Sequence, residues 1–467
     1  MKKLISILLA VMIVLGLCAC GDTGNGAGQT GGEATGLLAG YGRENITPDK
    51  PVGMGGYSDA ETRKSGGVLD YVYTTCVAFQ EGEQTILVYT IDVCGLSDMR
   101  MDQIRAAVTE QTGVPDENIF IGATHTHSAP AMGNDDEWDT FMLNSCAAAA
   151  KTAINDLASV QLQATTGELE NMNFVRHYLM NDGTYYGSNF GSSDSGFKAH
   201  AMEPDKQVVL LKLDRAEKAD ILMINWQAHP AAASRQVNYT DVSADFVGHT
   251  RSKLEDETGM LVAYYTGASG NLNPKSLIQG ENTNSNHDYR EYGKVLADKI
   301  IELLPSLAPV EGSGIKTTQM DFDAPIDHSW DHMIEQANEV YELWKTAGKS
   351  AGDSLGVTYG FTSSYQARAI RTRYNKPATE VRELRAFRVG PIGFTTGTYE
   401  MFSDHQQYVK ENSPFDITFL ITGCSGYIPN KQAYEYRSYE SDTGYYASGT
   451  GEAMAEEYVK LLNEVKD

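Results

Sequence analysis

Two histidines separated by one residue are the strongest chemical signal in the sequence. His125 and His127 lie in the segment Thr-His-Thr-His-Ser at residues 124–128, directly after an apolar run at residues 118–123. In an extended chain, alternate side chains point to the same face, so the two imidazoles are expected to share one site. A metal ion could bind both, or one could bind metal while the other transfers protons. The alternative is a hydrogen-bonded histidine pair without chemistry at a strand end.

Other residues with metal or proton chemistry also follow apolar runs, far away in the sequence. They are His229, Glu400 and Tyr427. In α/β sheets, functional sites form where strand ends meet. Two imidazoles and one carboxylate are a known ligand set for catalytic zinc, which leaves one position for water or substrate. The sequence therefore predicts that these three residues and His125 converge on one divalent cation.

The order of the predicted elements indicates an α/β domain. A β-rich run at residues 84–93 precedes a helical pattern at residues 99–112, where Met101, Ile104 and Val108 recur at helical spacing. The apolar run before the histidine pair follows at once. This β, α, β order is typical of a mixed, largely buried β-sheet core covered by helices, with the active site at the strand ends.

The start of the chain predicts export and membrane attachment. Two lysines precede an apolar stretch at residues 4–17, which is too short to remain as a membrane-spanning helix. The stretch ends in Leu-Cys-Ala-Cys and resembles a bacterial lipoprotein signal peptide at residues 1–19, which implies an acylated Cys20 and a lipid-anchored protein on the extracytoplasmic face of the cell membrane. Secretion with a free thiol is the alternative. A Gly-rich tether at residues 20–36 precedes one domain at residues 37–467, or two closely packed subdomains.

The charge of the chain excludes one class of partner. The formal net charge is −25, and the acidic residues are scattered along the sequence. A protein that binds a phosphate backbone needs the opposite sign, so nucleic acid is not expected as a partner. The 26 tyrosines could line an acyl or sugar groove, although buried tyrosines commonly serve packing alone.

Several short motifs occur in a collinear order that covers most of the domain. They are Gly-Tyr-Gly-Arg at residues 40–43, Ile-Thr-Pro at 46–48, Gly-Met-Gly-Gly-Tyr at 53–57, Thr-His-Thr-His-Ser at 124–128, Asn-Trp-Gln-Ala-His-Pro at 225–230, Ser-Ala-Asp-Phe at 243–246 and Gly-Tyr-Ile-Pro at 426–429. In this order they resemble the neutral (non-lysosomal) ceramidase family, specifically its N-terminal catalytic domain.

The resemblance implies a metal-dependent hydrolase that acts on linear amide bonds. It implies a Zn²⁺ ion held by His125 and His229, with Glu400 and Tyr427 completing the shell. It also implies that His127 acts as the acid or base. Zinc-bound water is then expected to attack the substrate carbonyl, with His127 taking the proton and returning it to the departing amine.

The substrate and its contacts are also implied by the resemblance. Arg176, Tyr436 and Tyr439 are expected to hold or polarise the substrate carbonyl and to donate to the developing oxyanion. The expected substrate is ceramide or a related lipid-like amide, or another N-acyl small molecule. The other expected partner is the membrane, reached through lipidated Cys20.

One segment departs from the family pattern. Where the family often has Gly-Asp-x-Ser-Pro, residues 270–274 read Gly-Asn-Leu-Asn-Pro. Asn271 and Asn273 therefore stand where a carboxylate and a hydroxyl are common. Amide hydrolysis is predicted more firmly than ceramide as the substrate. The same departure favours an alternative, a lipid-anchored binding protein with this fold that has lost catalysis.

A second alternative is a TIM-barrel metal amidohydrolase that binds one metal through His125 and His127. That fold requires an eightfold repeat of strand and helix, and the sequence shows none. A metallo-β-lactamase pattern would require Asp where Ala129 stands. Among the other histidines, His177 and His405 are the candidates for a position near the centre.

Overall fold

The computed structural model describes residues 36–57, 62–187, 196–236, 239–275 and 288–466. These residues belong to one compact unit that extends from Thr35 to Asp467. The predicted signal peptide at residues 1–19, the acylation site Cys20 and the tether up to residue 35 lie outside the described residues. None of the helices within the described ranges has the length and apolar character needed to cross a lipid bilayer.

A nine-stranded mixed sheet forms the larger half of the core, in the order β14-β12-β11-β6-β1-β3-β4-β5 with β16 beside β6. The pairs β4/β5 and β12/β14 are parallel and the other pairs are antiparallel. This open sheet confirms the predicted mixed sheet and is not a TIM barrel. Its strands are β1 (Leu37–Asn45), β3 (Tyr73–Glu81), β4 (Gln84–Ile91), β5 (Ile119–Ala123), β6 (Ala158–Glu168), β11 (Gln207–Arg215), β12 (Ile221–Trp226), β14 (Leu261–Thr266) and β16 (Ala308–Pro309).

A four-stranded sheet packs face to face on the larger one. Its strands are β17 (Ile315–Pro325), β18 (Thr379–Val389), β19 (Ile392–Gly397) and β21 (Ile417–Thr422). Phe387 of this sheet packs against Phe120 of β5 with ring centroids 4.0 Å apart, and Phe394 stacks on Phe387. One buried apolar cluster therefore joins the inner faces of both sheets.

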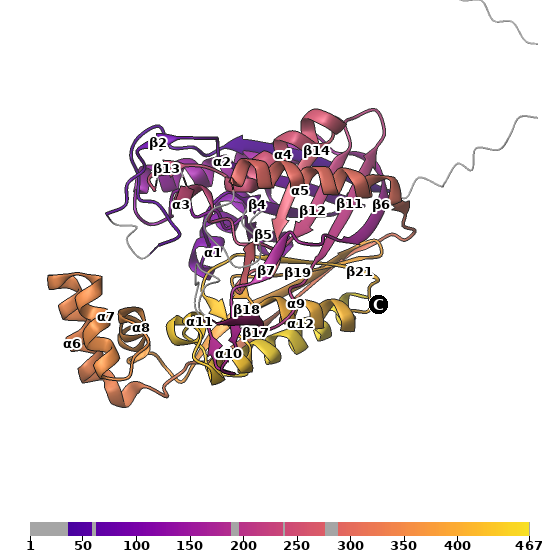
Figure 1. The fold of residues 1–467 in the computed structure, drawn as a ribbon. Helices are drawn as coiled ribbons and strands as arrows, with labels where there is room; N and C mark the ends of the chain where they lie inside the picture. Colours follow the sequence, from indigo (N-terminus) through magenta and orange to yellow (C-terminus); the bar gives the residue numbers. More distant parts are fainter. Residues whose placement is uncertain (1–35, 58–61, 188–195, 237–238, 276–287, 467) are drawn as a thin grey trace, which may run out of the picture. The chain divides into compact units, whose positions relative to one another are not determined.

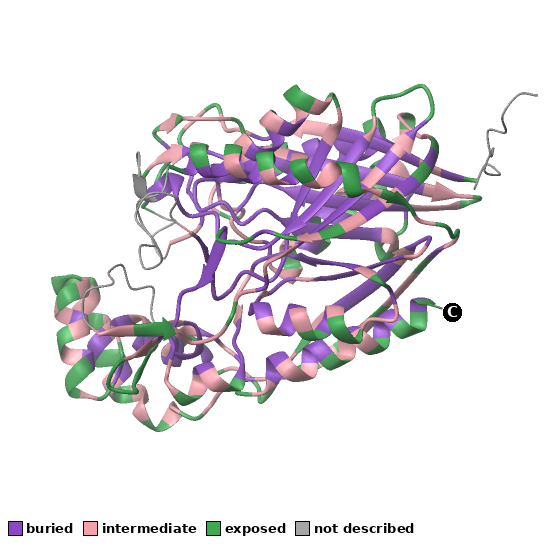
Figure 2. Ribbon diagram, turned by 45° about the vertical axis from the view of Figure 1, so that its right-hand side comes forward, coloured by how far each residue is buried: buried purple, intermediate pink, exposed green. Residues whose placement is uncertain are grey.

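Helices cover the outer faces of both sheets. Their bounds are α1 (Asp98–Thr112), α2 (Asp136–Asn155), α4 (Asp245–Thr258), α5 (Tyr289–Leu303), α9 (Ser403–Asn412) and α12 (Thr450–Lys466). Helices α1, α2, α4 and α5 share apolar clusters with the large sheet, and α9 and α12 share one with the small sheet. Figure 1 shows the resulting layers, and Figure 2 shows that the strands between the helices are buried. The predicted helix-covered sheet core is confirmed.

Close approach of a helix explains the Gly-Tyr-Gly motif in β1. A Cβ atom at Gly42 would lie 2.0 Å from the carbonyl oxygen of Ala149 in α2, so only glycine fits there. The adjacent Tyr41 points to the other face, where its hydroxyl donates to the Val262 carbonyl. The motif thus packs β1 against α2 on one face, and on the other face Tyr41 links β1 to the edge strand β14.

A small helical lobe is inserted between β17 and β18. It consists of α6 (Ile334–Ala347), α7 (Lys349–Thr358) and α8 (Ser364–Arg373), and it has its own small apolar core around Val340 and Phe361. We refer to residues 331–373 as the helical lobe. A helical pattern in the sequence at residues 329–345 corresponds to α6 alone of these three helices.

Short elements complete the described chain and several of them carry site residues. They are β2 (Gly67–Val68), β7 (Asn173–Val175), β8 (Tyr178–Met180), β9 (Tyr185–Tyr186), β10 (Phe197–His200), α3 (Ala233–Gln236), β13 (Asp241–Val242), β15 (Leu272–Pro274), β20 (Glu400–Met401), β22 (Tyr427–Ile428), α10 (Lys431–Glu435) and α11 (Tyr439–Thr443).

Candidate metal centre

The imidazoles of His125 and His127 lie close together, but the backbone between them is not the extended strand that the sequence suggested. Strand β5 ends at Ala123, and His125 adopts a left-handed conformation with φ of 68°. The expectation of an extended segment is therefore wrong. Nε2 of His127 nevertheless lies 3.3 Å from Nε2 of His125, with the rings at 86°. This backbone conformation costs a non-glycine residue about 1–3 kcal/mol of free energy, and residues that adopt it cluster at functional sites.

His229 and Glu400 lie at the same point. Nε2 of His229 is 3.0 Å from Nε2 of His125 and 2.9 Å from Nε2 of His127. Oε2 of Glu400 is 3.3 Å from Nε2 of His125, and its side chain is only 11% exposed. The structure thus brings together three imidazoles and one carboxylate from three distant parts of the sequence.

Backbone carbonyls set the direction of two of these imidazoles. Nδ1 of His125 faces the Cys94 carbonyl at 2.5 Å, and Nδ1 of His229 faces the Ser269 carbonyl at 3.4 Å. Because a carbonyl only accepts, each Nδ1 carries the hydrogen and each Nε2 presents a lone pair to the centre. Two lone pairs 3.0 Å apart repel each other unless a positive charge lies between them.

The electrostatics favour positive charge at this point. Burial disfavours the charged form of His125, but the Glu400 carboxylate outweighs burial and raises the pKa of His125 well above its usual value. Burial lowers the pKa of His229 well below its usual value, and the charges of His125 and Arg176 add to that effect. Beside the neutral imidazole of His229, the Glu400 carboxylate therefore favours a positive charge at Nε2 of His125, either a proton or a bound cation that takes the place of that proton.

The donor set fits zinc. His125, His229 and Glu400 form a group whose candidate ligand atoms all lie within 4.8 Å of one another. A tetrahedral ion at about 2.0–2.1 Å from its ligands would separate neighbouring ligand atoms by roughly 3.3 Å. The observed separations of 3.0 Å and 3.3 Å around His125 agree with that value. Nε2 of His127 lies equally close, so it fits both a ligand and a proton carrier.

Tyr427 lies beside Glu400 because their strands pair in register. Glu400 of β20 is directly opposite Tyr427 of β22 in a parallel pair, so their side chains are neighbours. The Tyr427 hydroxyl accepts a hydrogen bond from Nη2 of Arg176 at 3.2 Å. Burial raises the pKa of Tyr427 well above its usual value, and Glu400 adds to the effect.

A buried carboxylate that the sequence did not indicate holds Arg176. Oε1 of Glu440 accepts from Nε of Arg176 at 2.8 Å, and Oε2 lies 2.7 Å from Nε2 of His177. Burial opposes ionisation of Glu440, but His177 and Arg176 outweigh burial and lower its pKa to about 2. The chain thus has a fixed negative charge behind the guanidinium. Glu440 lies within a tyrosine-rich segment where no motif or periodicity marks it.

His177 and His405 have different surroundings. His177 joins the site, since its Nδ1 lies 2.6 Å from the Tyr436 hydroxyl and its side chain is fully buried. His405 is buried on α9 and packs against Gly451 of α12, where a Cβ atom would lie 2.2 Å from its Nε2. Only the first of these two histidines is therefore part of the site.

A cavity of about 590 Å³ opens onto the centre. Of the predicted residues, it is lined by His127, His229, Arg176, Tyr427, Tyr436 and Tyr439. Tyr439 and Tyr427 are in contact, with ring centroids 6.0 Å apart. Burial raises the pKa of Tyr439 to about 12, so its hydroxyl remains a proton donor at neutral pH.

The Gly-Met-Gly-Gly-Tyr loop supports His127. Gly56 has a φ of 101°, and a Cβ atom there would lie 2.7 Å from Cγ and Nδ1 of the His127 ring. Tyr57 contacts the same ring edge-on at 5.2 Å, and Arg63 donates to the His127 carbonyl at 3.0 Å. Glycine at position 56 therefore fixes how close the loop lies to the imidazole.

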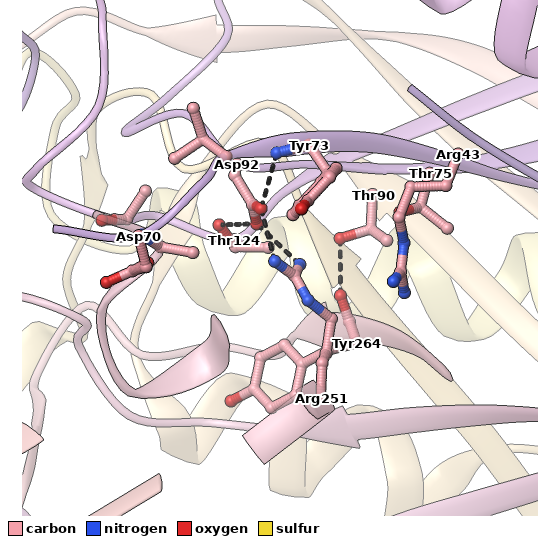
Figure 3. Close-up of polar contacts among 12 residues, drawn as sticks. Arg43, Asp70, Tyr73, Thr75, Thr90, Asp92, Thr124, Arg251 and Tyr264 are labelled. Atoms are coloured by element: carbon pink, nitrogen blue, oxygen red, sulfur yellow. Dashed lines mark hydrogen bonds and ion pairs between the residues drawn. The ribbon is translucent and has the colours of Figure 1, made fainter. Parts of the chain in front are cut away.

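A buried ion pair supports the strand end that precedes His125. Nη1 and Nη2 of Arg251 donate to the two oxygens of Asp92 at 2.8 Å and 2.5 Å, and neither side chain is more than 4% exposed. The Thr124 hydroxyl donates to Asp92 at 3.0 Å, and the backbone N–H of Tyr73 donates to it at 2.9 Å (Figure 3). The pair thus ties α4 to the strands beside the centre.

The two asparagines that depart from the family pattern have structural contacts. Oδ1 of Asn271 accepts from the backbone N–H of Ser403 at 2.9 Å, and its carbonyl accepts from the Arg176 N–H. Asn273 pairs with Phe174 between β15 and β7. Both are buried, and neither is among the residues that line the cavity in the described ranges.

Comparisons with known proteins agree with this fold. Residues 37–269 match the family model described as neutral/alkaline non-lysosomal ceramidase, N-terminal. Among solved structures, the neutral ceramidase from Pseudomonas aeruginosa superposes with a TM-score of 0.70 at 18% identity, covering 93% of this chain and 75% of that one. A ceramidase complexed with C2 superposes with a TM-score of 0.69 at 17% identity, covering 92% and 75%. No curated protein matches the chain.

Proposed function

Because the chain belongs to the neutral/alkaline non-lysosomal ceramidase family, we propose that it is a zinc-dependent hydrolase of linear amides. The proposed substrate is an N-acyl amine, either ceramide or a related lipid-like amide. The observation that supports the proposal most strongly is the convergence of His125, His127, His229 and Glu400 within about hydrogen-bonding distance of one another.

The metal would be held by His125, His229 and Glu400, with Tyr427 beside them. Zinc at such a site polarises a carbonyl and makes hydroxide available at neutral pH. His127 faces the same point and lines the cavity, so it can take a proton from the attacking water and return it to the departing amine.

Charge that develops on the substrate carbonyl oxygen needs donors along the cavity. Tyr436 and Tyr439 line it, and Arg176 supports Tyr427 by a hydrogen bond of 3.2 Å. The raised pKa of Tyr439, about 12, keeps this hydroxyl protonated during the reaction. Prepositioned donors of this kind contribute several kcal/mol to catalysis.

Metal analysis and turnover test the proposal together. We expect about one zinc per chain, activity on a panel of N-acyl sphingoid bases and N-acyl amino acids, loss of activity with a chelator, and recovery with zinc. His125→Ala should lose both zinc and turnover. His328→Ala removes an imidazole that pairs with Asp331 outside the cavity and serves as the control. Full activity in His125→Ala would refute the assignment.

One result would favour the alternative function. Stoichiometric zinc without turnover on any amide would indicate a binding protein that keeps this fold, as the replacement of Asp and Ser by Asn271 and Asn273 first suggested. Binding of an N-acyl amine without cleavage would then be the measured property.

We also propose that Cys20 is acylated and holds the protein on the outer face of the cell membrane. The support is the Leu-Cys-Ala-Cys sequence after a short apolar stretch. Metabolic labelling with a fatty acid should mark the full chain, and Cys20→Ala should abolish both the label and the membrane fraction. Membrane recovery of the unlabelled variant would contradict the proposal.

A further inference from the structure

The charged side chains that line the cavity, among the described residues, are all cationic, whereas the protein as a whole is acidic. The chain has a net charge of −25, yet no Asp or Glu is among the described residues that line the cavity. Three cationic side chains, Arg176, Lys349 and Arg437, do line it. In an acidic protein, a wall of this kind favours an anionic ligand.

Two of these cations lie at the helical lobe. Lys349 belongs to it, and Arg437 contacts it through Gly360 and Gln366. Nζ of Lys349, at the start of α7, lies over the Tyr365 ring at 4.6 Å and pairs with Asp353 at 2.6 Å. The side chain is 41% exposed, and one carboxylate leaves further ammonium hydrogens for a ligand. Tyr365 itself lines the cavity, so the ammonium group is held beside the ligand space.

Arg437 is held more firmly. Its guanidinium donates to the Gly360 carbonyl at 3.1 Å and to Oε1 of Gln366 at 2.9 Å, and its Cζ lies over the Trp330 ring at 4.7 Å. Its backbone φ is 56°, a conformation that costs a non-glycine residue free energy. The fold therefore fixes this guanidinium at the cavity wall at a cost in backbone strain.

The carboxylates that pair with the three cations lie behind them. Arg176 pairs with Glu440 at 2.8 Å and Arg437 with Asp442 at 3.5 Å, and Lys349 pairs with Asp353. None of these carboxylates is among the described residues that line the cavity. Each pair thus orients its positive end toward the ligand space.

A continuous line of aromatic contacts connects the metal centre with this wall. The rings of Tyr427 and Tyr439 are 6.0 Å apart, and those of Tyr439 and Tyr365 are also 6.0 Å apart. Lys349 lies on the next contact, over Tyr365. One substrate molecule can therefore place its amide at the centre and another group at the lobe.

From this arrangement we propose that the substrate carries an anionic group, a carboxylate or a sulfonate, on its amine part, separated from the amide by a chain long enough to reach the lobe. The inference rests on the proposed amide hydrolysis and specifies its substrate class. A simple acyl chain offers nothing to a cation, so the group that Lys349 and Arg437 recognise belongs to the amine part. N-acyl derivatives of long-chain ω-amino acids and ω-aminosulfonates are then the preferred substrates, ahead of the neutral ω-amino alcohols of the same length.

Three substrates with one acyl chain test the preference. The N-decanoyl amides of 12-aminododecanoic acid, 12-aminododecanesulfonic acid and 12-aminododecanol have equal chain lengths and differ in the charge at the far end of the amine part. We expect kcat/KM for at least one anionic amide to exceed that for the neutral alcohol by about ten- to a hundredfold, and the ratio to fall as salt is raised. Equal or better cleavage of the neutral alcohol would overturn the inference.

Replacing the two cations at the helical lobe tests whether they recognise the anionic group. Lys349→Gln and Arg437→Gln should each reduce the anionic to neutral ratio by about tenfold. Lys460→Gln removes a lysine that pairs with Glu457 on the surface of α12 and should leave the ratio unchanged. An unchanged ratio in both wall variants would overturn the inference.

Binding separates this inference from the proposed function. Calorimetry on the His125→Ala protein should show tighter binding of at least one of the two anionic amides than of the neutral alcohol, without any turnover. Such binding, together with no amide cleavage by the natural protein, would keep the anion site and refute the hydrolase. Amide cleavage without a binding difference would keep the hydrolase and refute the anion site.

Discussion

Two buried carboxylates neutralise buried arginines in different surroundings. Asp92 pairs with Arg251, and it also accepts from the Thr124 hydroxyl, directly after β5, and from the backbone N–H of Tyr73 in β3. Glu440 pairs with Arg176, and this arginine and His177 contact Tyr427 and Tyr436 at the cavity. The first pair supports the fold, and the second contacts tyrosines that line the cavity, which we propose as donors to a substrate.

The comparison shows that burial of an ion pair does not itself indicate its role. Both carboxylates have side chains at 0% exposure, so both must be paired to be tolerated. The two ion pairs differ in the residues to which their other hydrogen bonds connect them. We expect the network that ends in backbone and a threonine to affect stability alone, and the one that ends in tyrosines of the cavity to affect turnover as well.

The largest expected effect is a loss of folding stability, and we expect it when either ion pair is broken. Asp92→Asn and Glu440→Gln each leave a buried guanidinium without its counter-charge, so each should reduce the free energy of unfolding by about 3–5 kcal/mol. Urea denaturation measures this. The double replacement Asp92→Asn with Arg251→Met should recover much of the loss, because it removes the unpaired guanidinium while an amide oxygen at position 92 can still accept a hydrogen bond from the neighbouring donors. A loss below about 1 kcal/mol in the single variants would contradict the account.

Activity should then separate the two pairs. Glu440→Gln should lower kcat/KM about a hundredfold at unchanged zinc content, because Arg176 no longer holds the Tyr427 hydroxyl in place. Asp92→Asn, measured per folded molecule, should stay within about threefold of the natural protein. Equal activity losses in the two folded variants would remove the distinction drawn between the networks.

Two glycine-to-alanine variants extend the comparison to one position beside the candidate metal centre and one position in a distant turn. Gly56→Ala places a Cβ atom 2.7 Å from the His127 ring, so kcat should fall about tenfold or more while zinc is retained. Gly82→Ala, in the turn between β3 and β4, has a φ of 58° and no atom within 4 Å of the added Cβ. It should lose stability through backbone strain and keep kcat.

The smallest predicted effect is a pH dependence of stability. The pKa of Glu440 falls from 4.5 to about 2 on folding. Its contribution to stability is therefore complete above about pH 4.5 and is lost as the pH falls toward 2. Between pH 5.5 and 3.5, the natural protein should lose about 1 kcal/mol relative to Glu440→Gln in urea denaturation. A difference that stays constant over this range would contradict the assigned pKa.

Part of the fold was predictable because apolar runs decide it locally. The apolar run that precedes His229, at residues 221–226, is strand β12, and the helical pattern at 99–112 is α1 with one residue added. Helices α7 and α8 were missed, since α7 buries only Gly352 and Gly356 and so has no apolar stripe. Face-to-face packing of the two sheets depends on contacts between distant residues, which no local pattern shows.

The candidate site was predictable to a similar degree. Motif residues that follow strands, such as His229, lie where the sequence predicted, but their roles as ligands stay predictions. The left-handed conformation of His125 has no local signal, because it depends on surrounding tertiary contacts. Glu440 was missed since a single glutamate is normally a solvated surface residue, and only the fold brings Arg176 and His177 to it.

Anomalous scattering at the zinc absorption edge tests the central claim most directly. Crystals of the protein prepared with zinc should show one strong peak about 2.0–2.3 Å from Nε2 of His125, Nε2 of His229 and an oxygen of Glu400. A peak elsewhere, or no peak at full zinc content, would contradict the assignment of these residues to one metal centre.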